Sequence, residues 1–105
     1  MTENNIGNLE LKVILEEWTE SELGWGTRPD GASLHKNIES YKIFVKEYWD
    51  GMPKEVPNEY SRPNNSPIEV YVDKETFDKV QKSKNGIWIL QGSYYELKKN
   101  WRRAL

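Results

Sequence analysis

The sequence predicts one small α+β domain, with a sheet of three or four strands and about three helices packed on one face of the sheet. Apolar and polar residues alternate over residues 9–16 and 68–73, which is the period of a half-buried strand. Residues 38–49 instead place apolar side chains at helical spacing. Both kinds of element bury their apolar sides when the helices cover the sheet.

The first strand is expected over residues 9–15. A helix is the competing interpretation, because Leu11, Leu15 and Trp18 also share a helical face, but the β-branched pair Val13 and Ile14 favours the strand. The preceding residues 1–7 are polar and uncapped, which predicts a flexible tail before a single domain over 8–105. Residues 24–31 have the glycine, proline and aspartate content of a turn, and a short strand is expected at 32–34.

The clearest predicted helix begins after Asn37, a suitable N-cap. Gly51 suits a left-handed residue at its end, and Pro53 prevents continuation. The apolar stripe comprises Ile38, Tyr41, Phe44, Val45, Tyr48 and Trp49. Residues 52–66 contain three prolines and no periodicity, so no regular element is expected there.

The C-terminal part predicts a β-α-β-α segment. The strand at 68–72 leads to Asp73 as an N-cap, with Val72 and Phe77 at the positions of a hydrophobic staple. Residues 87–90 are interpreted as a buried strand. Ser93 and Glu96 have the spacing of a capping box, which starts a last helix. Its apolar stripe comprises Tyr94, Leu97, Trp101 and Leu105.

Composition narrows the classes of function. The chain has no cysteine, which excludes disulfides, cysteine nucleophiles and thiolate metal sites. Its single histidine argues against a zinc site, and no cofactor is expected. No secretory signal and no apolar run of about 20 residues is visible, so we expect a cytoplasmic protein outside the membrane.

Charge is unevenly distributed along the chain. Residues 1–60 carry 6 basic and 12 acidic side chains, a net charge of −6, and residues 61–105 carry 9 basic and 5 acidic ones, a net charge of +4. This pattern favours attraction between the two halves of one fold, or between two copies placed head to tail. A basic face for nucleic acid is the other interpretation, but the total charge of −2 disfavours it.

No nucleophile elbow, phosphate loop, dinucleotide fingerprint or metalloprotease motif occurs. His35 is either a general base paired with Asp30 or an ordinary packed residue, and we favour the second. Four glutamates cluster after the first strand, where they either hold Mg²⁺ with a phosphate or form a solvated acidic edge, which we favour. They are Glu16, Glu17, Glu20 and Glu22.

Two segments with similar contents are the best candidate site. Each joins an aromatic residue to an arginine beside a proline: Trp25 and Arg28 in the first, Tyr60 and Arg62 in the second. Arginine offers a fork for phosphate, and an aromatic ring offers a stacking face, so the segments suit a nucleotide, with Asp30 and His35 as further candidates. The alternative is structural: the arginines fasten the long loop to the domain, and the aromatic residues cap a thin core.

The segments 24–31, 59–63 and 83–86 resemble small uncharacterised proteins encoded by phages and prophages. The resemblance implies a bacterial cytoplasm and a role in phage–host conflict, and it brings no catalytic residues. We therefore expect a non-catalytic protein that binds a host protein or a second copy of itself. The alternative is a module that binds a nucleotide or phosphorylated metabolite through the two arginine segments. An enzyme using His35 is the least supported possibility.

Overall fold

The computed structural model describes residues 11–22, 26–55, 57 and 59–104. The predicted flexible tail over residues 1–7 lies outside the described residues, as do Leu9, Trp25 and Leu105. The α+β class is confirmed: the described residues form three α-helices and a six-stranded antiparallel sheet, which is larger than the three or four strands predicted.

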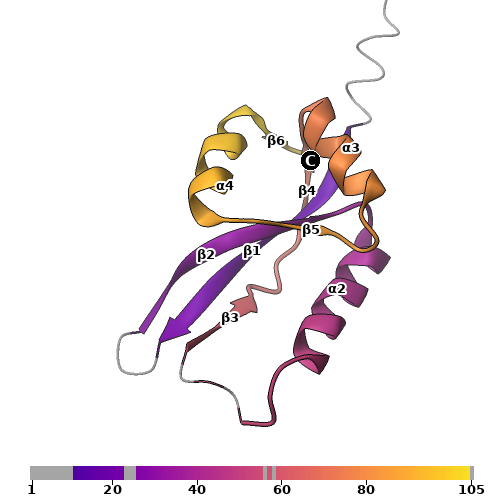
Figure 1. The fold of residues 1–105 in the computed structure, drawn as a ribbon. Coiled ribbons are helices and arrows are strands. Elements are labelled where there is room, and N and C mark those ends of the chain that lie inside the picture. The colour runs from indigo at the N-terminus through magenta and orange to yellow at the C-terminus, as the bar shows by residue number, and fades with distance from the viewer. Residues whose placement is uncertain (1–10, 23–25, 56, 58, 105) are drawn as a thin grey trace, which may run out of the picture.

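The long strand β1 is the centre of the sheet (Figure 1). One edge of β1 pairs with β2, and the other edge pairs with β4 along its first half and with β3 along its second half. β5 then extends the sheet beyond β2, and β6 extends it beyond β4. The strands are β1 (Lys12–Glu22), β2 (Gly26–His35), β3 (Glu59–Pro63), β4 (Ile68–Tyr71), β5 (Ile87–Ile89) and β6 (Arg102–Arg103).

The helices cover both faces of the sheet, so the prediction of one covered face is wrong. They are α2 (Ile38–Asp50), α3 (Lys74–Lys82) and α4 (Gln91–Leu97). Figure 1 shows α3 and α4 on one side of the sheet and α2 on the other. The reason lies in β1, where Val13, Ile14 and Leu15 are consecutive and all buried. Neighbouring strand residues point to opposite faces, so such a run needs cover on both sides.

The core on the α3 and α4 side is aliphatic, whereas the α2 side is aromatic and polar. The first is built from Val13, Leu15, Ala32, Leu34, Val70, Val72, Val80, Ile89 and Tyr94, with Phe77 packed against it. On the second, Trp18 lies at right angles to the rings of Phe44 and Tyr48 and to that of Trp88. Burial of both sets provides the main stabilisation of the fold.

Three segments are strands where sequence periodicity gave no such signal. β1 continues to Glu22, and β2 begins at Gly26, where a turn was expected. A register shift accommodates Asp30 and Gly31 opposite the single residue Trp18, which is the arrangement of a β-bulge. β3 forms within the supposedly structureless loop because the second half of β1 offers it an unpaired edge.

The helix starts at Asn37 and Asp73 are confirmed: their side chains accept hydrogen bonds from the backbone N–H groups of Ser40 and Thr76. Gly51, however, ends α2 in a right-handed conformation, not a left-handed one.

The last helix differs most from expectation. α4 begins at Gln91, so Ser93 lies inside its first turn and does not cap it. The Gln91 side chain accepts a hydrogen bond from the Gly31 N–H, which ties this turn to β2. After Leu97 a 3₁₀ turn, Lys98–Asn100, leads into β6, where Arg102 lies over the Tyr71 ring. Pairing of β6 with β4 therefore replaces the final turns of the predicted C-terminal helix, whose first part is present as α4.

The predicted β-α-β-α order is present as β4, α3, β5 and α4, but the two strands are not neighbours. β4 and β5 are separated in the sheet by β1 and β2. Because each adjacent pair is antiparallel, β4 and β5 run in opposite directions.

Candidate functional site

Arg28, a predicted ligand-binding residue, is held by carboxylates. Its Nε lies 2.6 Å from Glu20 Oε1, and its guanidinium also pairs with Glu22 at 2.8 Å. The hydrogen bond to Glu20 and the two negative charges raise the pKa of Arg28. A phosphate at this site would have to displace two carboxylates from the guanidinium.

The second predicted segment meets the first, but not through the two arginines. The Ser61 hydroxyl donates a hydrogen bond to the carboxylate of Asp30. Arg28 is opposite Glu20 in the sheet, whereas Arg62 is opposite the neighbouring Thr19. Neighbouring residues of β1 point to opposite faces, so the register places Arg28 and Arg62 on opposite faces of this part of the sheet.

The described residues Tyr60 and His35 each have neighbours other than the two arginines. The Tyr60 ring packs against Trp49 at 6.4 Å between centroids. Trp25 lies outside the described residues. His35 is at the far end of β2 from Arg28 and is not bonded to Asp30.

His35 is part of a buried hydrogen-bonded chain. Its Nδ1 lies 2.7 Å from the carbonyl oxygen of Asn85, so Nδ1 carries the proton. Nε2 then accepts from the Ser33 hydroxyl at 2.8 Å, and the Ser33 oxygen accepts from Trp18 Nε1 at 2.8 Å. Burial lowers the pKa of His35, against the raising effect of the Asn85 carbonyl. Ser33 and His35 have the hydrogen-bond contact of a nucleophile and its general base, but both side chains are 0% exposed.

Glu16 does not belong to the predicted solvated acidic edge, because it is 0% exposed. Its carboxylate accepts hydrogen bonds from the Tyr41 hydroxyl and from the backbone N–H groups of Asn65 and Ser66. The buried carboxylate thereby joins β1, α2 and the turn that follows β3. These three hydrogen-bond donors explain how the Glu16 side chain is accommodated within the fold.

A different acidic group lies at the open end of β1. One carboxylate oxygen from each of Glu20, Glu22 and Glu59 falls within a span of 4.8 Å, which is close enough to hold a cation. Arg28 already supplies a positive charge to the first two. We interpret the group as an ion-pair network at the exposed tip of the sheet.

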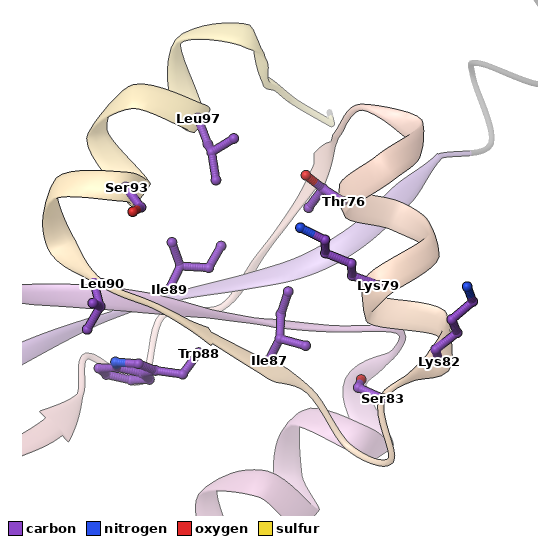
Figure 2. Close-up of a pocket in the computed structure, with 10 residues that line it drawn as sticks. All are labelled: Thr76, Lys79, Lys82, Ser83, Ile87, Trp88, Ile89, Leu90, Ser93 and Leu97. Atoms are coloured by element: carbon purple, nitrogen blue, oxygen red, sulfur yellow. The ribbon is translucent and has the colours of Figure 1, made fainter.

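A hollow that was not predicted lies elsewhere, between α3 and α4 over β5 (Figure 2). Its volume is about 740 Å³. Ile87 and Ile89 form the floor, Leu97 projects from α4, and Lys79 and Lys82 project from α3. Thr76, Ser83, Trp88, Leu90 and Ser93 complete the lining. We call this hollow the β5 groove.

The strand that forms the floor of this groove is partly exposed, which corrects the prediction of a buried strand at 87–90. Trp88 is 40% exposed and Leu90 is 69% exposed. β5 pairs with β2 on one side only among the described residues. The sequence signal for this strand was a run of four apolar residues between Gly86 and a helix. Periodicity alone does not distinguish a central strand from an edge strand, so the exposure of β5 could not be predicted from it.

A smaller hollow of about 320 Å³ lies on the α2 side of Trp88. Its lining is almost wholly aromatic: Trp18, Phe44, Tyr48 and Trp88, with Ser61. Trp88 thus borders both hollows, and the Tyr48 hydroxyl is bonded to the Ser61 carbonyl.

No helix in the described part of the chain is both long and apolar enough to cross a membrane. Comparison of the sequence with protein-family models and with curated proteins, and of the structure with solved structures, finds no match.

Proposed function

We propose that this chain is a non-catalytic binding protein that holds a segment of another protein in the β5 groove. The observation that carries this proposal is the exposure of Trp88 and Leu90 beside a groove of about 740 Å³. Large apolar side chains gathered at a hollow are typical of surfaces that bind a partner.

Catalysis is not part of this proposal. The only histidine is buried and kept uncharged by burial, and the Ser33 hydroxyl beside it is also buried. A phage-encoded chain that acts on a host protein in the cytoplasm fits this function. The phage origin and the cytoplasmic location stay predictions. The experiment below distinguishes a host-protein partner from the alternative one, a second copy of the chain.

The nucleotide-binding alternative has weaker support. Arg28 is committed to Glu20 and Glu22, and the register separates it from Arg62. The β5 groove has aliphatic and lysine side chains but no arginine fork for a phosphate. Titrating the tryptophan fluorescence with mono-, di- and cyclic nucleotides should give no saturable change; quenching that Arg28→Ala abolishes would favour the alternative instead.

The direct experiment selects binders for the protein from a library of random linear peptides displayed on phage. The selected peptides are synthesised with a fluorescent label, and binding is followed by anisotropy. Leu90→Lys should lower the affinity at least about tenfold, since it places a charge in the apolar contact. Ile43→Lys is the matched control, because Ile43 is also an exposed aliphatic residue, 43% exposed, but lies on α2 across the sheet.

An equal loss of peptide affinity in Leu90→Lys and Ile43→Lys, or an equal retention of it, would contradict the proposal. Sedimentation of the wild type over a range of concentrations tests the second copy. Self-association that Leu90→Lys abolishes would assign the groove to another copy of this chain and overturn the proposed partner.

A further inference from the structure

We infer that the partner segment is an extended, acidic and aliphatic strand that adds to the free edge of β5. This inference rests on the proposed function and specifies the conformation and charge of the bound segment. It is carried by a contrast between the edges of the sheet and by the charges around the β5 groove.

The outer strands of the described sheet differ in chemistry. β6 consists of Arg102 and Arg103, and β3 ends in Arg62 and Pro63. Charged residues and proline on edge strands discourage pairing with another chain. β5 is Ile87–Ile89, with tryptophan between two isoleucines, and carries neither charge nor proline. Of these edges, β5 is therefore the one whose side chains suit pairing.

A strand placed beside β5 would contact apolar side chains on both faces. Ile87 and Ile89 face the groove, and Trp88 lies on the other side of the strand, toward Trp18 (Figure 2). Consecutive side chains of an added strand also alternate between the two faces. Backbone hydrogen bonds would supply affinity, and the groove and Trp88 would select aliphatic side chains at alternate positions.

The charge of the groove specifies the remaining positions. Of its described lining residues, Lys79 and Lys82 carry charge, and no carboxylate is among them. Lys79 has a long ion pair of 3.8 Å with Glu75, and Lys82 has no ion pair within the described residues. These ammonium groups complement carboxylates of a bound strand and oppose a basic one.

The same charges disfavour a second copy as the occupant. Joining two copies along β5 would bring the α3 lysines of each copy toward a groove that is already positive. An acidic segment from a different protein meets no such repulsion.

The test uses a peptide selected through the groove, defined by loss of binding to Leu90→Lys and not to Ile43→Lys. A series of variants of this peptide is synthesised, each with one backbone amide N-methylated. In strand addition, alternate amides bond to β5 and the others point away. We expect at least a tenfold loss at alternate positions and little change between them.

The charge is tested on the protein. Lys79→Glu combined with Lys82→Glu should weaken binding at least tenfold, and the wild-type affinity should fall as salt is raised. Lys42→Glu combined with Lys46→Glu on α2 is the control, with two exposed lysines replaced on the opposite face. Circular dichroism verifies that all variants are folded.

Two results would overturn the inference while the proposed function stands. Loss at every consecutive methylated position would indicate a helical peptide, and loss at none would indicate docking by side chains alone. Groove-binding peptides that are neutral or basic, or that bind the glutamate variant equally well, would refute the acidic partner. Failure to select any groove-dependent peptide would instead contradict the proposed function itself.

Discussion

The Ser33 hydroxyl oxygen lies 2.8 Å from Nε2 of His35, two residues further along β2, and both side chains are fully buried. With Asn85 and Trp18 as further partners, every polar atom of the pair is bonded within the fold. Protonating Nε2 would remove its ability to accept from Ser33 and would place a charge beside the rings of Tyr41 and Phe44. The pair is therefore a structural element whose burial favours the neutral form of His35.

Acidification should destabilise the protein through His35. Its pKa is lowered in the folded state, so the unfolded state binds the proton more readily. The stabilisation is thus present above the unfolded pKa of about 6.5 and is lost as the pH falls below it, with a slope of up to about 1.4 kcal/mol per pH unit. Urea unfolding between pH 7 and 5 measures this slope, and His35→Asn should flatten it.

NMR provides an independent check, because His35 is the only histidine and its ring signals are unambiguous. Its midpoint in the folded protein should lie below 6.5. Burial raises the pKa of Asp73, but hydrogen bonds from Thr76 and Trp101 lower it by more, so the net shift is downward. Asp73 therefore titrates in a more acidic range and does not interfere with the titration of His35. A midpoint at or above 6.5 would contradict the structural interpretation of the pair.

Glu16→Gln should destabilise the fold by about 2 kcal/mol, because it leaves the backbone donor of a partly buried hydrogen bond without its acceptor. One carboxylate oxygen accepts from Asn65 N–H and the other from Ser66 N–H. Glutamine replaces one of these oxygens by an NH₂ group, so in either orientation one backbone N–H loses its partner. Chemical denaturation measures the change.

Glu69→Gln serves as the matched substitution, since Glu69 is exposed on β4 and has only a 3.5 Å ion pair with Lys12. It should change the free energy of unfolding by less than about 0.5 kcal/mol. Equal effects of the two substitutions would mean that the bonds to Glu16 contribute nothing specific.

Local signals predicted much of this fold. Asn37 and Asp73 could be identified as N-caps because a cap depends on a few neighbouring residues. β3 could not be predicted, since its strand character comes from pairing with β1, about 40 residues earlier in the chain. The start of α4 was missed for the same reason: the bond that ties Gln91 to Gly31 spans 60 residues.

The site was harder to predict than the fold. Arg28 was singled out as a candidate ligand-binding residue, but its partners Glu20 and Glu22 depend on the β1·β2 register. The β5 groove arises because β5 lies at an edge between two helices, which no local pattern encodes. Glu16 resembles its neighbouring glutamates in sequence, and only the fold separates this buried side chain from the exposed Glu17 and the half-buried Glu20 and Glu22.

Arg28→Ala should lower the melting temperature at low ionic strength, because it leaves Glu20, Glu22 and Glu59 close together without their cation. The difference from wild type should shrink at about 1 M salt, where the Debye length is only about 3 Å. Lys46→Ala, which breaks the isolated surface pair with Asp50, should have a smaller effect that depends less on salt. A salt-independent loss in Arg28→Ala would mean that packing, not charge, is lost.

Gly31→Ala should destabilise the fold more than Gly26→Ala and should also weaken binding at the β5 groove. Both glycines have positive φ, +88° and +89°, so both substitutions incur a backbone penalty of about 1–2 kcal/mol. A Cβ at Gly26 meets open space, whereas one at Gly31 would lie 2.4 Å from the carbonyl oxygen of Ile89.

The difference between the two variants therefore isolates the close approach of the β2 bulge to β5. Relieving the contact requires Ile89 or the bulge to move, at a further cost of about 1–3 kcal/mol by analogy with overpacking. Urea denaturation gives the two stabilities, and anisotropy with a groove-binding peptide gives the affinities. Reduced affinity in folded Gly31→Ala, with Gly26→Ala unchanged, would link the bulge to the position of the binding edge; equal stability and affinity in the two variants would refute that link.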